Sequence, residues 1–488
     1  MDFGSMVKSL QDKSILITGT SGFLAKIFME KVLRSQPKVK KLFICLEQMM
    51  IHLLHNDCKM KYLPHGPFQS NIICSITLLG KKVFRDLKKE HGTDSESFIL
   101  NKVIAIAGDI SFENLGIKDS TLKDEMWKEI SFIFNVAGNT TFDERVLIHL
   151  PFFAITILKY DVALSINALG VKHICEFAKK CTKLEYYFTA YITREKEGII
   201  LEKRFQVDET FGGNHSLDVA AEKKVVHVRL KARLFGWANI YVFTKAIGEM
   251  LIGHLRGDLP VVILCPTIIT STYQEPFPGW IEGFRTIDSL IVSYGKGKLN
   301  HFLADPEAPL DVVPGDMVVN AMLASMAAHC RQRSEFIYHV STSKSNPMKN
   351  NELVDYIYRY LFKNPCLGRD GMPIKVTRGS LLPTKASFNN LMTLHYKLPI
   401  QVLRIMNALS FQTLENQYRN LNRKYNLIIR FVELYEHFSL FKARNLRVMS
   451  IKDDNITSMK FYLDPKCINW EDYFVNIHIH GLVQHSIK

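Results

Sequence analysis

The sequence predicts an α/β protein built on a doubly wound parallel sheet, followed by a small helical C-terminal domain. Two patterns support this prediction. Short apolar segments alternate with segments of helical periodicity through the first half of the chain, and a glycine turn joins the first of each kind. After about residue 366 the pattern changes to long amphipathic helices over residues 399–440. We therefore place a domain boundary near Asn364-Pro365, which gives domains of 10–365 and 366–488.

The elements of the predicted sheet follow in order. Six apolar segments have the length of strands: 14–17, 41–46, 103–107, 132–136, 187–189 and 261–264. Three segments between them have helical periodicity: 23–34, 163–180 and 241–255. Pro37 ends the first of these helices. Strands alternating with helices indicate a parallel sheet that is covered on both faces.

Composition sets limits on the class of protein. The chain has 488 residues, 47% of them apolar and 23% charged, which fits a globular protein and excludes a mainly disordered, collagen-like or coiled-coil chain. Its 62 Lys and Arg against 48 Asp and Glu give a net charge of +14. Such a charge favours an anionic partner: a phosphorylated cofactor, an acyl carrier, a lipid surface or a nucleic acid.

Cysteine usage and hydropathy bear on the compartment. The nine Cys are scattered and odd in number, so we expect no disulfide framework and a reducing compartment. The N-terminus has no apolar core typical of a signal peptide. The most apolar stretch, 147–158, is shorter than the roughly 20 residues that cross a bilayer. We expect a soluble or peripheral protein without a signal peptide or transmembrane helix.

A glycine turn follows the first predicted strand and opens the first helix. Gly19 permits a sharp turn, Gly22 lets the backbone approach a pyrophosphate, and Ala25 allows the helix and strand to pack closely. The helix N-terminus would face the phosphates with its N–H groups and positive dipole end. We expect cofactor contacts from five residues of this turn: Gly19, Thr20, Gly22, Phe23 and Leu24. The alternative is a surface turn that merely contains glycine.

Two carboxylates follow the next strands. An acidic residue after the second strand hydrogen-bonds a free ribose 2′-hydroxyl, whereas an Arg suits a 2′-phosphate. The chain has Glu47 at this position, which by itself favours NAD. Asp109, after the third strand, is placed to approach the adenine, although an ordinary loop carboxylate is nearly as good an interpretation.

Tyr241 and Lys245 are candidates for catalysis because residues four apart share one face of a helix. With 18 Tyr, about one chance Tyr-x-x-x-Lys match is expected in such a chain. The order along the chain supports the pair, because a polar strand end with Thr189 precedes it and another strand follows. Asn167 lies in the preceding helix and could bend it or hold a water near Lys245; a solvated helical Asn is the alternative.

These residue types suit the reduction of a carbonyl. Hydride transfer leaves negative charge on the carbonyl oxygen, and a phenol can donate a proton there. The unperturbed phenol pKa of about 10 is high for this task, and we expect the ammonium of Lys245 to lower the pKa of Tyr241. Lys245 could also hold the ribose of a nicotinamide nucleotide. Thr189 would donate a hydrogen bond to the same carbonyl oxygen.

Longer segments resemble the alcohol-forming fatty acyl-CoA reductases of plants, which are extended short-chain dehydrogenase/reductases with a Rossmann-type sheet and their own C-terminal domain. The resemblance covers most of residues 10–488. It rests on ILITGTSGFLAKIFMEKVL, GDISFENLGIKDS, NTTFDER, YDVALSINALGVKHICEFAKKC, LFGWANIYVFTKAIGEMLI, STYQEPFPGWIEG, LDVVPGDMVVNAM and FYLDPKCINWEDYFVNIHIHGLV.

The resemblance implies that NADPH reduces a long-chain acyl-CoA to an aldehyde with loss of CoA, and that a second NADPH gives the primary alcohol, as in lipid and wax metabolism. It also implies a position on the cytoplasmic side of the endoplasmic reticulum membrane, with peripheral association. The family's nucleotide turn falls on Gly19, Gly22 and Ala25. Its proton donor falls on Tyr241 and its lysine on Lys245. The strand-end hydroxyl falls on Thr189.

Four departures from the family pattern stand out. Glu47 replaces an Arg suited to the 2′-phosphate, Phe188 replaces a serine, and Cys265 replaces an Arg. Residues 146–159 interrupt an otherwise continuous match. We interpret this insert, and the poorly matching stretch 48–79, as translated non-coding sequence or the result of a poor gene model. A membrane-dipping loop at 146–159 is the alternative.

Two rival functions follow from these observations. One is another extended reductase, such as a nucleotide-sugar epimerase, against which the region around Trp470 argues. The other is a catalytically impaired reductase-like protein, because of Glu47 and the insert at 146–159. Aromatic residues at 277–280 suit either the wall of an acyl-chain site or the core.

Other motifs carry less. His52, His55 and Cys58 lack a fourth metal ligand, so we expect no metal. His478 and His480 would share a face if extended, and core or surface histidines are the favoured interpretation. The basic C-terminal helices lack a nucleic-acid motif, and a lipid surface fits them better.

Overall fold

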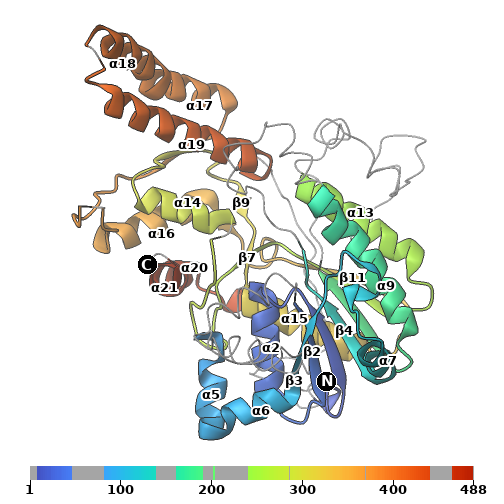
Figure 1. The fold of residues 1–488 in the computed structure, drawn as a ribbon. Helices are drawn as coiled ribbons and strands as arrows, with labels where there is room; N and C mark the ends of the chain where they lie inside the picture. Colours follow the sequence, from blue (N-terminus) through green and yellow to red (C-terminus); the bar gives the residue numbers. More distant parts are fainter. Residues whose placement is uncertain are drawn as a thin grey trace, which may run out of the picture.

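A seven-stranded parallel sheet forms the centre of the molecule (Figure 1). The computed structural model describes residues 8–46, 82–138, 161–190, 202–203, 240–284, 286–368, 370–410, 412–439 and 464–486. The strand order is β11-β6-β5-β4-β1-β2-β3. The strands are β1 (Ser14–Thr18), β2 (Lys41–Leu46), β3 (Val103–Ala107), β4 (Ile130–Asn135), β5 (Tyr186–Ala190), β6 (Val261–Pro266) and β11 (Glu335–Val340). The predicted doubly wound sheet is confirmed.

The central strands form because both of their faces are buried. Every residue of β1 and β4 is buried, as expected for apolar runs in a parallel sheet covered on both sides. All six predicted strands are present. The sequence did not predict β11, which pairs only with β6 at the edge of the sheet and is largely half-buried. Its mixed composition, EFIYHV, follows from that edge position.

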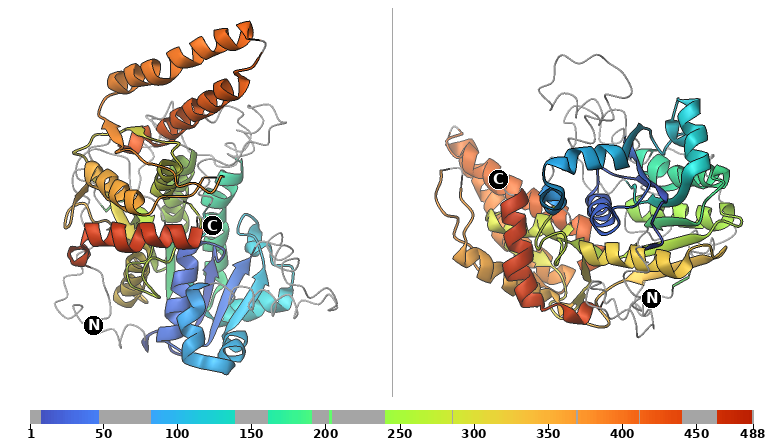
Figure 2. Two further views of the ribbon diagram at one scale, coloured as in Figure 1. Left: turned by 90° about the vertical axis from the view of Figure 1, so that its left-hand side faces the viewer. Right: turned by 90° about the horizontal axis from the view of Figure 1, so that it is seen from below.

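Helices cover both faces of the sheet (Figure 2). Ile15 and Ile17 of β1 point to the face covered by α2 (Phe23–Ser35) and α15 (Gly315–His329). Leu16 points to the other face, where α7 (Ser120–Glu129) and α9 (Gly170–Lys180) lie, with α13 (Ile240–Leu255) beside α9. The alternation follows from the two-residue period of a strand.

The remaining helices and strands lie around this centre. The helices are α5 (Arg85–His91), α6 (Ser95–Lys102), α14 (Thr286–Gly295), α16 (Asn350–Lys363), α17 (Lys385–Met392), α18 (Leu398–Leu409), α19 (Glu415–Ser439), α20 (Trp470–Asp472) and α21 (Ile479–Ser486). The short strands are β7 (Ile268–Thr270), β8 (His301–Leu303), β9 (Pro309–Leu310), β10 (Val312–Pro314), β12 (Met348–Lys349) and β13 (Ser380–Leu382). Within the described residues, we find no helix whose length and apolar character would let it cross a bilayer.

The amphipathic helices predicted over 399–440 are confirmed as α18 and α19. The two helices lie side by side and form a helical hairpin (Figure 1). Asn407 holds the connection, since its Oδ1 accepts from the backbone N–H of Leu414 at 3.0 Å and its Nδ2 donates to Glu415 at 2.7 Å. The helices pack with Leu299 and Leu303, at and before β8, on a small core that also includes Phe388, Met392, Tyr396 and Ile428.

The last described segment, 464–486, does not share that core. Trp470 and Tyr473 belong to the large core that contains α2 and α15. Trp470 Nε1 donates to the carbonyl of Asn346 at 3.0 Å, and the Tyr473 hydroxyl donates to the carbonyl of Ser271 at 2.8 Å. The segment after residue 366 therefore contributes to two separate cores, and the division of the chain into 10–365 and 366–488 stays a prediction.

Candidate active site

The candidate site lies where the strand order reverses. Strands β1 and β4 are neighbours, yet the chain leaves β1 toward β2 on one side and returns to β4 on the other. In open parallel sheets, ligands bind outside the carboxyl ends of the strands at such a point. The glycine turn follows β1, and Thr189 lies at the end of β5, next to β4.

The glycine turn has the geometry that its sequence predicts. Gly19 has a φ of +71°, and a Cβ there would lie 2.7 Å from the backbone N and Cα of Ala137. Gly22 donates its N–H to the carbonyl of Gly19 at 2.9 Å, and α2 begins at the next residue with no acidic side chain in its first turn. The helix N-terminus thus faces the crevice without a competing carboxylate, as a bound pyrophosphate requires.

The side chains of the other residues predicted in the turn make contacts within the protein. Thr20 is buried, and its Oγ1 donates to the carbonyl of Cys45 at 3.0 Å, so its side chain ties the turn to β2. The Phe23 ring stacks on Trp280 with centroids 4.9 Å apart, and Leu24 is half-buried. Trp280 is therefore part of the large core, and a role of residues 277–280 in lining an acyl-chain site stays a prediction. Contacts of these residues with a cofactor stay a prediction.

The structure describes one of the two predicted carboxylates, Asp109, but not the other, Glu47. Asp109 is half-buried after β3, and its Oδ1 accepts from the Ser111 N–H at 2.8 Å and the Ser111 hydroxyl at 2.7 Å. This arrangement fits a loop carboxylate, and a role toward the adenine stays a prediction. Glu47, the stretch 48–79 with its His52, His55 and Cys58, and the insert 146–159 lie outside the described residues.

A buried polar network connects the ends of three strands. The Thr18 hydroxyl donates to Asn135 Oδ1 at 2.7 Å, and Asn135 Nδ2 donates to Thr189 Oγ1 at 3.2 Å. All three side chains are buried. Because Thr189 accepts this bond, its own proton can be donated elsewhere. Sequence reasoning missed Asn135, although a polar residue at the end of the apolar segment FIFN was a signal.

Lys245 lies against the glycine turn. Its Nζ donates to the carbonyls of Ala137 at 3.2 Å and Ala190 at 3.3 Å, and a Cβ on Gly138 would lie 2.8 Å from it. Ala137 is the residue that Gly19 touches. The structure therefore brings the predicted lysine, the ends of β4 and β5, and the turn together. Burial lowers the pKa of Lys245 to about 8, partly opposed by the charge of Cys265.

Tyr241 lies one turn before Lys245 at the start of α13, and it is half-buried. Burial, with a smaller contribution from the charge of Cys265, raises the pKa of Tyr241 to about 12. The pKa of Tyr241 is therefore raised and not lowered as expected, because desolvation of the phenolate outweighs any stabilisation by the Lys245 ammonium. The phenol is the protonated form at neutral pH, which is the form that donates a proton.

Asn167 is a buried part of the site's framework. It lies in a π-helical turn, Ser165–Leu169, and its Nδ2 donates to Thr244 Oγ1 at 3.0 Å. Thr244 in turn donates to the carbonyl of Tyr241 at 3.1 Å. A Cβ on Gly138 would lie 3.5 Å from Asn167 Oδ1. The alternative of a solvated Asn is wrong, and such π-turns are frequent at functional sites.

Two residues that depart from the family pattern, Phe188 and Cys265, lie in different surroundings. Phe188 is fully buried in β5 and packs on Phe134 with centroids 5.6 Å apart, on the face that α2 covers. Cys265 is buried near the carboxyl end of β6, and its charge raises the pKa of both Tyr241 and Lys245. Cys265 therefore belongs to the surroundings of the candidate pair, whereas Phe188 belongs to the core.

The loop after β7 is fixed to the glycine-turn helix, which sequence reasoning missed. Lys26 of α2 pairs with Glu282 at 2.5 Å, and the buried Lys31 pairs with Glu275. The buried carboxylate of Asp316 accepts the backbone N–H groups of residues 273, 274 and 275 at 2.7, 2.8 and 3.0 Å. Burial raises the pKa of Asp316, and these backbone hydrogen bonds oppose that rise. The loop is thus held at the same edge of the sheet as the site.

A second buried polar cluster joins the C-terminal segment to β7 and α14. His478 Nε2 lies 3.1 Å from Asp288 Oδ1, and His478 Nδ1 lies 3.0 Å from the Ser271 hydroxyl. Residues 473–478 form a π-helical turn, so His478 and His480 do not alternate on a strand. His478 is a core histidine, one of the favoured interpretations. Within the part of the chain that the structure describes, no group of three His, Cys, Asp or Glu residues could hold a metal ion.

Comparison with known proteins finds relatives over the whole chain. The family model described as Male sterility protein matches residues 74–322. The chain is 42% identical to the probable fatty acyl-CoA reductase 4 of Arabidopsis thaliana, over 99% of each chain. It is 39% identical to the alcohol-forming fatty acyl-CoA reductase of Simmondsia chinensis, over 100% of each.

The fold also resembles solved structures. The terminal R domain from the myxalamid PKS-NRPS biosynthetic pathway superposes with a TM-score of 0.54 at 13% identity, over 97% of this chain and 91% of that one. At this identity the likeness concerns the fold alone. The family model and the full-length identities carry the assignment: the chain belongs to the fatty acyl-CoA reductase family, whose members bind a nicotinamide cofactor on this fold.

Proposed function

We propose that this protein reduces long-chain fatty acyl-CoA to a primary fatty alcohol through the aldehyde, with NADPH as the reductant. The observation that carries the proposal is the contact of Lys245 with Ala137, because it joins the candidate catalytic helix to the glycine turn. Full-length similarity to an alcohol-forming relative supports the substrate class.

The residues present fit a nicotinamide nucleotide. The N-terminus of α2 carries no acidic side chain, and the glycines at 19 and 138 keep the backbone open where a Cβ would collide. Residues 19–24 would hold the pyrophosphate, and Lys245 would hold the ribose of the nicotinamide half. The bound cofactor would supply the hydride.

This chain's own groups would handle the charge that follows. When hydride reaches the thioester carbonyl, negative charge develops on oxygen, and the Thr189 hydroxyl would donate a hydrogen bond to it. The Tyr241 phenol donates the proton, and the Lys245 ammonium stabilises the phenolate that remains. Loss of CoA as a thiol gives the aldehyde, and the same groups act on the aldehyde in a second reduction.

The test uses purified full-length protein, NADPH and a panel of acyl-CoAs from about C16 to about C30, since the depth of the acyl site is not fixed by the residues above. The proposal predicts fatty alcohol as the product. Binding of NADPH without any product would instead favour the rival, a catalytically impaired reductase-like protein. A sugar nucleotide converted in place of acyl-CoA would favour the other rival.

We place the protein on the cytoplasmic side of the endoplasmic reticulum membrane as a peripheral protein. The support is the basic composition and the apolar product of the proposed reaction. Fractionation of cells that express the tagged chain tests this, because alkaline carbonate should release a peripheral protein from the microsomal pellet.

A further inference from the structure

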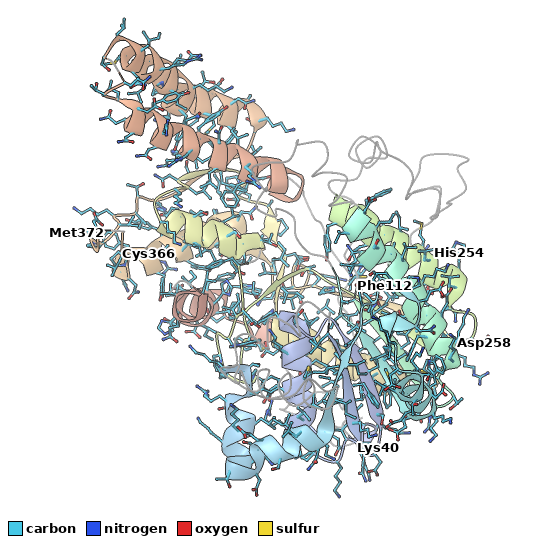
Figure 3. All side chains as sticks on the ribbon, in the orientation of Figure 1. Lys40, Phe112, His254, Asp258, Cys366 and Met372 are labelled. Atoms are coloured by element: carbon cyan, nitrogen blue, oxygen red, sulfur yellow. The ribbon has the colours of Figure 1, made fainter. Side chains whose placement is uncertain are left out.

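The outer side of α18 carries large apolar side chains that are mostly exposed within the described part of the chain. Five exposed apolar residues of this helix are between 48% and 77% exposed: Leu398, Val402, Ile405, Met406 and Leu409. We call them the α18 stripe. At 100° per residue they fall within an arc of about 100° on the helix. The hairpin that carries this stripe projects from the rest of the molecule (Figure 3).

The opposite face of α18 is the one that packs. Asn407 is buried against the start of α19, and Ile400 packs against the small core of the hairpin. The α18 stripe is therefore not part of the face with which α18 packs against the hairpin. Exposed apolar residues in a contiguous stripe mark an interaction surface, whereas scattered ones do not.

Charge around the stripe points to the partner. From 385 to 430 the chain has seven Lys and Arg and one acidic residue, Glu415. Lys397 and Arg404 are exposed and lie, by helical position, between the packed face and the stripe. An apolar stripe flanked by cations is the pattern of a helix that lies in the plane of an anionic membrane surface.

Size argues against a second copy of this chain as the partner. The 12 residues of α18 give a surface about 18 Å long and about 10 Å wide. That is roughly 200 Å², well below the roughly 800 Å² per partner that a stable dimer buries. A bilayer needs no matching surface of this kind.

We propose that the α18 stripe inserts into an anionic lipid bilayer and holds the protein at the membrane surface. The hairpin of α17–α19 projects from the body (Figures 1 and 2), so the helix can reach the bilayer while the sheet stays in water. The inference names the surface behind the peripheral association of the proposed function, but it does not depend on the reductase chemistry.

The experiment measures co-flotation of the full chain with vesicles of phosphatidylcholine, alone or with about one-third phosphatidylserine. The double variant Ile405→Gln/Leu409→Gln should bind the anionic vesicles at least about tenfold less tightly than the unaltered protein. The matched control is Leu367→Gln, which changes an equally exposed leucine (69%) beside Cys366, on a different part of the surface (Figure 3), and it should bind normally. Circular dichroism checks that all three proteins are folded.

Three outcomes would overturn the proposal. Either the stripe variant and the control bind equally, or neutral and anionic vesicles bind equally well. A dimer that dissociates in the double variant, without vesicle binding, would also overturn it and would assign the stripe to a second copy. Tyr241→Phe separates this inference from the proposed function, because that variant should lose turnover yet bind vesicles as the unaltered protein does.

Discussion

Lys245 donates a hydrogen bond to the carbonyl of Ala137 at 3.2 Å, and the backbone of Ala137 is in contact with Gly19. These residues come from α13, the end of β4 and the turn after β1. The glycine turn or the Tyr-x-x-x-Lys pair could each occur by chance in a sequence. Because the structure places the two motifs next to each other, they are better explained as parts of one site. Four predictions follow from this geometry and its surroundings, and one further prediction concerns Glu47.

Asn135 should affect catalysis through Thr189. Thr189→Val should lower kcat by about 10²-fold, since it removes a donor to the developing oxyanion. Asn135→Ala removes the group that holds Thr189 at 3.2 Å, and we expect a loss of about tenfold in kcat with little change in KM. The double variant should be no slower than Thr189→Val alone, because both changes act on one hydroxyl. Steady-state kinetics of the three variants checks this, and losses that multiply would contradict it.

Activity should fall as the pH rises through about 8. The ammonium of Lys245, with a pKa of about 8, is needed to stabilise the phenolate of Tyr241, and the phenol itself stays protonated up to about pH 12. The folded pKa of Lys245 lies below its ordinary value of 10.5, so this group adds stability as the pH rises from 8 to 10.5. Deprotonation of the Lys245 ammonium therefore does not unfold the protein between pH 8 and 10.5. The measurement is the pH profile of kcat/KM with circular dichroism at each pH, and a flat profile up to pH 10 would contradict the role of Lys245.

The C-terminal segment should be essential for stability because of one backbone contact. A Cβ on Gly481 would overlap the carbonyl oxygen of Gly279. Gly481→Ala should therefore separate α21 from the body or shift the loop, at a cost of about 1–3 kcal/mol. Gln484→Ala, an exposed position on the same helix, is the control and should stay within about 0.5 kcal/mol. Urea unfolding measures both; equal midpoints would show that the contact is dispensable.

Much of this site was predictable because its motifs are local. The glycine turn and the Tyr241–Lys245 pair each lie within one strand–turn–helix unit or one helical turn, where spacing alone determines which residues share a face. Asn135 and Asp316 were missed because their partners lie 41 to 117 residues away in sequence, so only the tertiary structure brings them together. The pKa of Tyr241 was mispredicted for a related reason: sequence spacing locates the ammonium but not the burial that outweighs it.

Strand β11 and the contacts of the C-terminal segment were also not predicted, for two different reasons. Strand β11 is half-buried at the rim of the sheet, so its residues lack the apolar run that identified the central strands. The C-terminal segment was assigned to a separate helical domain because it follows the long amphipathic helices over 399–440. Its contacts with β7 and α14, through Tyr473 and His478, could not be read from that pattern.

Glu47 gives a prediction that rests on the sequence. If this carboxylate faces the ribose, Glu47→Arg should increase the preference for NADPH over NADH, since a guanidinium favours the 2′-phosphate. The ratio of kcat/KM for the two cofactors is the measurement. An unchanged ratio would mean that another residue reads the 2′ position.

Tyr241→Phe tests the central claim most directly. Removing one hydroxyl should lower the rate of fatty alcohol formation by about 10²- to 10⁴-fold, because the proton donor is lost. NADPH binding, followed by the change in its fluorescence, should stay within about threefold, since Lys245 and the glycine turn are untouched. A variant that binds NADPH and keeps the rate of the unaltered protein would contradict the account and would leave the proton donor to be sought elsewhere.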